Sequence, residues 1–499
     1  MSGYLIVALP WFTGGLICLA VAGGSEAEDP QNTQPERRTL PPEFLFGLGG
    51  LLGCVAWGNA LWVADQFGHT LLGSHSVVYL ALLLALAALL IRKNSIRLQT
   101  AHKLRCLDRC FLLLLSALLG LALYLQHMTP LFAWDGLDHW AKNAGEFIPQ
   151  TLIDEPAVFN RHYSNHPATV VMIAAWTGWS MQFTNTLGWG TPWLLCMISL
   201  CFMTAGFIRS LTGKLTSALL GGVLTATVPL AESHTLIAGY AELWLAAVVI
   251  AGLLLLGLGL EYQRRSWILT GVLVGGLAIA IKNNGPGYAL CVWGALVFSW
   301  LTYRPKIATL VLLSLGAVAY GLCAKGFLVD WAGIKIQWNP DTQNLFFAIR
   351  DKLFFTGRLS TDVIFPFEGV VINELYSLFA NQSFSTAVLA LLFGVVAICC
   401  PSRTTLHQLI PLTDNGGAGS SSIGKIGVQP LIIGALLILS MLILSQLFLP
   451  YSYNHGLPGS DTGNSRFSLP FILAAIPAAI VMAHTIMKKP RRRVALYPS

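Results

Sequence analysis

Long apolar runs separated by short polar segments dominate the pattern of this chain. Each run approaches the roughly 20 residues that a helix needs to cross a bilayer. We therefore predict an all-α polytopic membrane protein with about 13 spanning helices. The runs cover residues 4–24, 44–65, 74–91, 110–129, 190–208, 215–232, 241–260, 267–281, 286–303, 307–328, 383–401, 430–449 and 467–486.

One further apolar stretch, residues 168–186, is long enough to span but is rich in Trp, Thr and Ser. Basic residues decide its placement, because short cytoplasmic loops carry an excess of Lys and Arg. If this stretch stays at the outer interface, most of the 30 basic residues, including the KKPRRR tail, face inward. If it spans, every later loop changes side. We therefore predict an interfacial helix in the first large outer loop, 130–189.

Composition agrees with a membrane protein, since 55% of the residues are hydrophobic, 11% are charged and the mean hydropathy is +0.65. The net charge of +7 would suit a nucleic-acid partner. However, the Lys and Arg residues are spread over the short inner loops, so we expect no nucleic-acid binding. The ten cysteines lie in apolar runs or beside basic loops, without the spacing of a metal site. We expect neither a disulfide framework nor a zinc site.

Most of the 23 acidic residues fall on the outer side in this topology, so we expect the working surface there.

The chain divides into four predicted parts. The parts are 1–109, with accessory N-terminal helices and a basic cytoplasmic loop; 110–328, a transmembrane core that contains the loop 130–189; 329–382, a second outer loop; and 383–499, with C-terminal helices and a basic cytoplasmic tail.

Two acids stand between aromatic residues in the segment LFAWDGLDHWAKNAGEF. Asp135 and Asp138 are three residues apart, so on a helix they share a face. Trp134 and Trp140 flank them as anchors at the level of the head groups. The pattern predicts an interfacial helix with its carboxylates facing a cavity, although an ordinary amphipathic surface helix would have the same pattern.

Other charged residues are predicted at the same boundary. Glu242, in LIAGYAELWLA, begins a spanning helix. A carboxylate in lipid costs about 2.5–3.5 kcal/mol, which favours a polar cavity, unless Glu242 only stabilises the helix start. Lys282, in GLAIAIKNNGPGYAL, lies where Asn283 and Pro286 separate two apolar helices, and Arg466 begins the last helix. Such cations suit a phosphate at the membrane boundary, with contact to lipid head groups as the alternative.

The segment FNRHYSNHPATVV adds Arg161, His162, Tyr163 and His166 to the first outer loop. The two histidines are four residues apart, a spacing that can share a metal on a helix. Pro167 instead indicates a turn or a helix start. We therefore predict no metal site from these histidines and a helix beginning after His166.

Taken in order, these segments resemble the polytopic GT-C glycosyltransferases that use polyprenyl-phosphate sugars. WDGLDHWAKNA is similar to their acidic first outer loop, and YSNHPATVVMIAAW to the proline-containing start of the next interfacial helix. AGYAELWLA is similar to their second acidic loop, and GLAIAIKNNGPGYAL to the KNEG-type segment of bacterial members. The resemblance covers roughly residues 130–305, with a weaker match at NSRFSLPFILAAIP. Two features depart from the family pattern: three extra helices precede the acidic loop, which usually follows the first helix, and Asn284 stands where the KNEG-type segment has a carboxylate.

The resemblance implies that residues 110–328 form a GT-C catalytic core. The enzyme would move a sugar, with inversion, from a polyprenyl-phosphate donor to a hydroxyl of a cell-envelope glycan, lipid or secreted protein such as a pilin. The reaction would occur at the periplasmic face of the bacterial inner membrane. Asp135 would act as general base, Asp138 and Glu242 would orient the acceptor or the base, and Lys282 and Arg466 would stabilise the departing phosphate.

The resemblance also leaves open a divalent metal ion, which some relatives hold with paired acids. No other cofactor is implied. Further expected substrate contacts are Trp134, His139, Lys142, Arg161, Tyr163, His166, Tyr240 and Asn283.

Two other functions stay open. A lipid-linked glycan transporter or flippase would show inverted halves, pairs of broken helices and ionisable residues near the bilayer centre. No repeat between the halves is visible in the sequence. An O-antigen ligase or polymerase would use a diphosphate-linked donor and a large outer loop. The loop 329–382 is moderately large and carries Arg350, Lys352 and Arg358.

Overall fold

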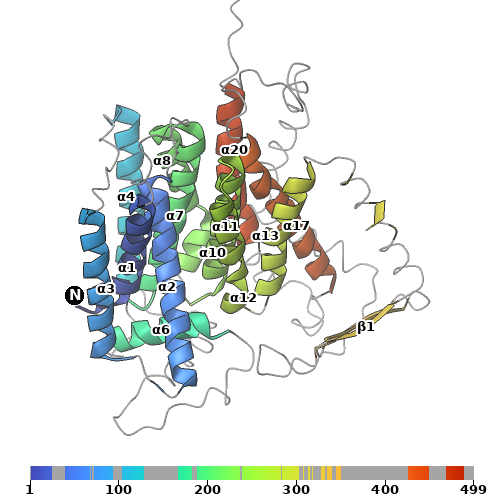
Figure 1. Cartoon of the computed structure of the whole chain (residues 1–499), viewed down its shortest axis with the longest axis horizontal. Helices are drawn as coiled ribbons and strands as arrows, with labels where there is room; N and C mark the ends of the chain where they lie inside the picture. The colour runs from blue at the N-terminus through green and yellow to red at the C-terminus, as the bar shows by residue number, and fades with distance from the viewer. Residues whose placement is uncertain are drawn as a thin grey trace, which may run out of the picture.

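The computed structural model of the chain is mostly helical, and most of its helices run side by side in one bundle (Figure 1). It describes residues 2–24, 40–67, 69, 72–93, 104–128, 167–181, 188–236, 239–282, 284–302, 307, 313–314, 317, 327–331, 334–339, 344–349, 425–448 and 468–487. The predicted runs 307–328 and 383–401 lie largely or wholly outside these residues. Each of the other predicted runs overlaps one described helix, except 215–232 and 267–281, which each overlap two.

Six described helices are long and apolar enough to cross a membrane, and a bent pair, α8 and α9, would make a seventh span. These helices make the chain compatible with a multi-pass membrane protein. The helices are α1 (Ser2–Gly24), α2 (Pro42–Gln66), α3 (Ser74–Lys93), α4 (Cys106–Met128), α6 (Ala168–Ser180), α7 (Thr191–Thr212), α8 (Leu215–Ala226), α9 (Pro229–Leu236), α10 (Glu242–Glu261), α11 (Arg265–Gly276), α12 (Ala278–Ile281), α13 (Gly285–Thr302), α17 (Lys425–Phe448) and α20 (Leu469–Met487).

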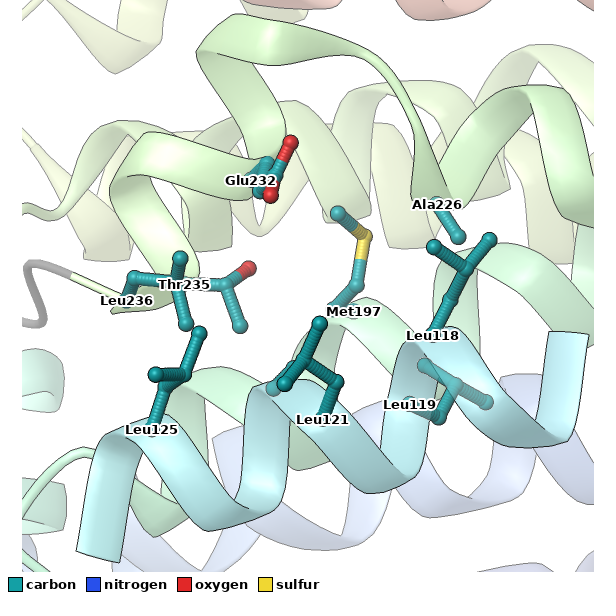
Figure 2. Close-up of a pocket in the computed structure, with 10 residues that line it drawn as sticks. Leu118, Leu119, Leu121, Leu125, Met197, Ala226, Glu232, Thr235 and Leu236 are labelled. Carbon is teal, nitrogen blue, oxygen red and sulfur yellow. The ribbon is translucent and has the colours of Figure 1, made fainter. Parts of the chain in front are cut away.

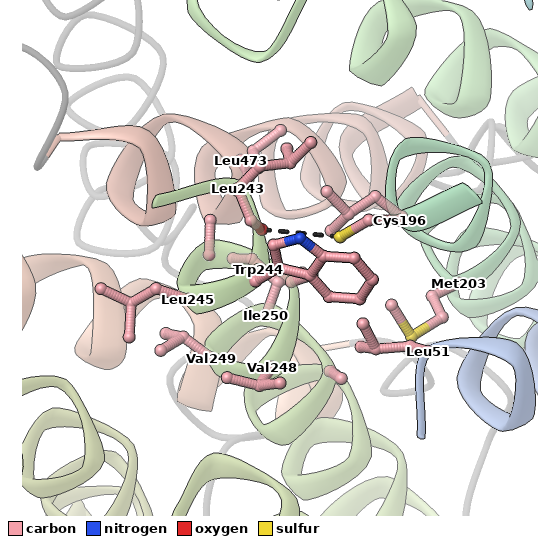
Figure 3. Packing of buried hydrophobic residues seen from close by; sticks show 14 of the residues in the cluster. Leu51, Cys196, Met203, Leu243, Trp244, Leu245, Val248, Val249, Ile250 and Leu473 are labelled. Carbon is pink, nitrogen blue, oxygen red and sulfur yellow. Dashed lines mark hydrogen bonds between the residues drawn. The ribbon is translucent and has the colours of Figure 1, made fainter. Parts of the chain in front are cut away.

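Helix α10 forms the centre of the bundle. It is hydrophobic on all sides, the pattern of a helix surrounded by protein, and 94% of its apolar window is buried. Figure 3 shows Trp244 of α10 among Leu51 of α2, Met203 of α7 and Leu473 of α20. By contrast, only 17% of the α3 window and 11% of the α4 window are buried. These two helices therefore form the periphery and present their leucines outward.

Glycines let pairs of helices approach closely. A Cβ atom at Gly257 of α10 would lie 2.2 Å from the carbonyl oxygen of Gly427 in α17. At the same contact, the Gly427 amide donates to Glu261 Oε2 over 2.8 Å, which satisfies one of the open N–H groups at the start of α17. The α10–α17 contact thus requires glycine at position 257.

We expect Gly257→Ala to lower the free energy of unfolding by about 1–3 kcal/mol, because the new methyl group must push two backbones apart. Unfolding in detergent micelles measures the change. Gly120→Ala on the exposed surface of α4 is the matched control, since a Cβ atom there meets nothing within 4 Å. Equal stability of the Gly257 variant and the wild type would contradict the close contact.

Helix α6 lies across one end of the bundle instead of along it (Figure 1). Its 13 residues extend about 20 Å, which is less than the roughly 30 Å of bilayer hydrocarbon. Pro167 occupies its N-cap, and Thr169 donates a hydrogen bond to Asn59 Oδ1 of α2 over 3.1 Å. The predicted interfacial helix covers residues 168–186, of which the structure describes a helix over Ala168–Ser180; its place at an interface stays a prediction. It is also buried at nearly every position, so it packs as part of the bundle.

The predicted single helix 215–232 is wrong in detail. The structure divides it into α8 and α9, which meet at a bend of 60°. Pro229 begins α9, and its ring and missing N–H prevent a continuous helix through this point. The second half extends to Leu236, so the bend directs the chain toward the start of α10.

Part of the predicted outer loop 329–382 forms an antiparallel sheet, which corrects the all-α expectation locally. The strands are β1 (Phe327–Trp331), β2 (Ile334–Asn339) and β3 (Asn344–Ile349), in the order β1-β2-β3. Val329 pairs with Ile336, and Ile336 with Phe347. These segments are rich in the β-branched and aromatic residues that favour strands, and only two residues join β1 to β2.

Candidate functional site

The structure brings together two residues from separate predicted motifs. Lys282 Nζ lies 2.5 Å from Glu242 Oε1, although the residues are 40 positions apart. The Glu242 side chain is 2% exposed and the Lys282 side chain is 14% exposed. The pair is therefore almost wholly enclosed, and the lysine is the member that solvent or a ligand can reach.

Glu242 owes its position to the start of α10. It is the first residue of that helix, where the aligned peptide dipoles favour a negative charge. Two residues earlier, the Tyr240 carbonyl accepts a hydrogen bond from Trp193 Nε1 of α7 over 2.8 Å. Gly239 has a φ of +114°, a backbone conformation that favours glycine. The turn and the Trp193 contact together fix the entry to the helix.

Lys282 stands at a break between two helices. It ends α12 with an extended backbone, φ −152° and ψ 158°, and its carbonyl accepts a hydrogen bond from the Gly285 amide over 2.8 Å. A Cβ atom at position 285 would lie 1.8 Å from the carbonyl oxygen of Ala278, so α13 can begin here only with glycine. The hydrogen bond from Gly285 back to Lys282 thus closes a tight turn, which leaves the lysine side chain directed toward Glu242.

A second set of contacts holds α9 beside this segment. Gln126, near the end of α4, donates through Nε2 to the carbonyl oxygens of Gly190 over 2.7 Å and of Thr235 over 2.5 Å. The rings of His234 and Tyr240 lie 5.1 Å apart. We call the end of the bundle where α4 and α9 end and α10 begins the Glu242 end. Helix α6 packs against α12 at this end as well.

Of the predicted site residues, the structure describes Glu242, Lys282 and Tyr240. Glu242 and Lys282 meet, and Tyr240 lies in the segment that leads into α10, with its ring against His234. The predictions for the remaining site residues fall outside the described part of the chain and stay predictions. They are Trp134, Asp135, Asp138, His139, Lys142, Arg161, Tyr163, His166, Asn283 and Arg466.

Three residues that support the site were not predicted as functional. Trp193 is hidden in an apolar run, and its role depends on the tertiary contact with Tyr240. His234 follows the unpredicted bend between α8 and α9. Gln126 could have been noticed, because a buried amide at the end of an apolar run needs hydrogen-bond partners.

Within the described ranges, no group of three or more His, Cys, Asp and Glu side chains could hold a metal ion. Asp135 and Asp138, the acids to which the resemblance would assign a metal, are not among the described residues. The described cysteines are free thiols, and Cys54, Cys196 and Cys201 are buried among apolar side chains.

Comparison with known proteins gives no relative. No family model matches the chain, and no curated protein sequence or solved structure matches it. The functional interpretation therefore depends on the geometry of the Glu242 end and on the sequence motifs located there.

Proposed function

We propose that this chain is a membrane glycosyltransferase of the GT-C type with about 13 spanning helices. It moves a sugar, with inversion, from a polyprenyl-phosphate donor to a hydroxyl of a cell-envelope glycan, lipid or secreted protein. The reaction takes place at the periplasmic face of the bacterial inner membrane. The observation that carries the proposal is the enclosed Glu242–Lys282 pair, which joins two of the motifs that resemble the family.

The pair supports a site for the phosphate of the donor. A lysine ammonium group binds phosphate as a point charge. The 14% exposure of Lys282 leaves the group within reach of a ligand. Because Glu242 already fixes its position, the cation needs little reorganisation when negative charge develops on the leaving phosphate. Such preorganised charges act most strongly where water is excluded.

The remaining steps use the acids of the first outer loop. Asp135 removes the proton of the acceptor hydroxyl as its oxygen attacks the anomeric carbon, and the bond to the phosphate oxygen breaks. Asp138 orients the acceptor or holds Asp135 in place. Arg466 adds a second cation for the phosphate. The resemblance leaves open a divalent metal ion held by the paired acids, although none of these steps requires one.

The bent pair α8 and α9 favours a second candidate, a lipid-linked glycan transporter or flippase. Broken helices near a substrate site are a feature of many transporters. The 60° bend lies close in sequence to Glu242, and the chain breaks again at Lys282. A transporter would move the lipid-linked sugar across the membrane without cleaving its phosphate bond.

A donor panel separates these functions. Purified protein in detergent micelles receives polyprenyl-phosphate sugars, polyprenyl-diphosphate sugars and a crude envelope acceptor, and the release of free polyprenyl phosphate is followed by mass spectrometry. We expect release from the monophosphate donors only. Consumption of the diphosphate donors alone would favour a ligase. Intact donors of both kinds, together with donor movement across proteoliposomes, would favour the transporter.

A further inference from the structure

A groove on the outside of the bundle lies between α4, α7, α8 and α9 (Figure 2). Leu118, Leu121 and Leu125 of α4 form one wall, with spacings of three and four residues that place them on one face. Met197 of α7 lies opposite them, and Glu232 of α9 stands at the edge (Figure 2). We call this feature the leucine groove. Its lining is apolar apart from the Glu232 carboxylate and the Thr235 hydroxyl, and that hydroxyl donates a hydrogen bond to the Ala231 carbonyl in the same helix.

The α4 wall of the leucine groove is largely exposed. Only 11% of the α4 window is buried, and Leu121 is 54% exposed. In a chain that crosses the membrane, such a surface is covered by lipid chains. The groove therefore offers a surface on which an acyl chain can pack without a protein partner.

Glu232 gives this groove a chemical preference. Its side chain is exposed, and no cation among the described residues contacts it. Glu232 lies in the first turn of α9, where the helix dipole stabilises a negative charge. The dipole explains an acid at this point of the helix, but it does not explain why the acid lies beside an apolar groove. An exposed carboxylate at a lipid surface is costly unless a cation or water meets it.

Glu232 lies near the level at which α4 ends. The next turn of α9 is tied to the last turn of α4, because the Thr235 carbonyl accepts a hydrogen bond from Gln126 Nε2. Glu232 therefore lies about one turn from the last turn of α4, where a spanning helix meets the head groups. A head group at this level can reach the carboxylate while its acyl chain extends along Leu121 and Leu118.

We propose that the leucine groove binds a membrane phospholipid that carries a primary ammonium head group. The ammonium donates hydrogen bonds to the Glu232 carboxylate, and one acyl chain packs against Leu118, Leu121 and Leu125. The site is separate from the Glu242–Lys282 pair and does not depend on the proposed transfer reaction.

Native mass spectrometry of the full chain, released from micelles with equal amounts of phosphatidylethanolamine, phosphatidylcholine and phosphatidylglycerol, tests the site. We expect about threefold to fivefold more bound phosphatidylethanolamine than phosphatidylcholine, the range of an interfacial ion pair. Glu232→Gln should abolish the preference, and Glu232→Asp should retain part of it. Asp65→Asn, at the end of α2 and outside the groove, is the control and should leave the preference unchanged.

Two results would overturn the proposal. One is equal retention of the three lipids by the wild type. The other is a Glu232→Gln variant that still prefers phosphatidylethanolamine over phosphatidylcholine, whether or not its thermal stability falls. Glu232 would then interact only with the α9 dipole. Leu121→Trp fills the groove, and it should reduce the preferred adduct without affecting the fold, because Leu121 is 54% exposed. An undiminished adduct in this variant would also count against the groove as the binding site.

Discussion

Glu242→Gln is expected to lower the free energy of unfolding by about 3–5 kcal/mol, because it leaves the Lys282 charge enclosed without the carboxylate that balances it. The carboxylate is 2% exposed and the lysine 14% exposed, so water cannot fully replace the lost contact. Glutamine keeps the size and polarity of the side chain, which restricts the change to charge. Titration with a denaturing detergent in mixed micelles gives the unfolding free energy.

The matched control is the ion pair at the opposite end of the bundle. Arg209 Nη1 lies 3.0 Å from Glu43 Oε1, and the two side chains are 21% and 23% exposed. Because this pair is better hydrated, Glu43→Gln should cost no more than about 1 kcal/mol. Equal losses of unfolding free energy in Glu242→Gln and Glu43→Gln would contradict the idea that burial makes the Glu242–Lys282 pair the more important of the two for stability.

The double variant Glu242→Gln/Lys282→Met separates stability from function. Removing both charges should restore most of the stability, since buried ion pairs are often replaceable by uncharged groups. The rate of polyprenyl phosphate release should nevertheless stay about 10²–10³-fold below that of the wild type, because the cation for the leaving phosphate is gone. If activity returns together with stability, the pair is a structural contact and Lys282 does not assist the reaction.

The second large effect is expected at Asp135. Asp135→Asn should lower turnover by about 10²–10⁴-fold, because asparagine cannot accept the proton of the acceptor hydroxyl. Donor binding should remain close to that of the wild type, since the phosphate contacts are assigned to Lys282 and Arg466. Single-turnover release of polyprenyl phosphate and equilibrium binding of the donor measure the two quantities separately.

Asp154→Asn provides the control for Asp135, because it removes a carboxylate from the same predicted loop but outside the WDGLDHW segment. Its turnover should match that of the wild type. Parallel loss of binding and turnover in Asp135→Asn would argue for a role in donor binding or folding and against a general base.

Much of the helical layout was predictable from apolar length alone. The run 241–260 differs by only one residue from α10, because Glu242 and Glu261 mark its two ends. The boundaries of α2, α3 and α20 agree to within about two residues, as expected where polar residues flank an apolar run. These helices follow from local sequence, since each must satisfy its own backbone groups in a bilayer.

Features that depend on local backbone chemistry were only partly predicted. Pro229 is a visible signal for the bend between α8 and α9, but the apolar run through it favoured one helix. Strand β3 has the sequence NLFFAI, a short apolar segment whose periodicity does not distinguish strand from helix. In both places, the length of the apolar run predicted the secondary structure less well than local backbone preferences do.

The two halves of the Glu242–Lys282 pair were each predicted, but their contact was not. Nothing in AGYAELWLA or AIKNNGPG specifies a partner 40 residues away. Their meeting depends on the turn at Gly285, which must approach Ala278, and on the Trp193 hydrogen bond that places Tyr240. Tertiary contacts of this kind are invisible to motif spacing, because each partner sits in a different helix.

The burial of α10 limits how the Glu242 end can move. Because this helix is enclosed by α11, α17, α7 and α20, we expect its backbone amides to exchange with solvent only when these neighbours open. Glu242 therefore begins a helix that is buried along most of its length. We expect α10 to hold Glu242 in place while motions on the microsecond to millisecond scale that admit or release a ligand occur in less buried parts of the chain.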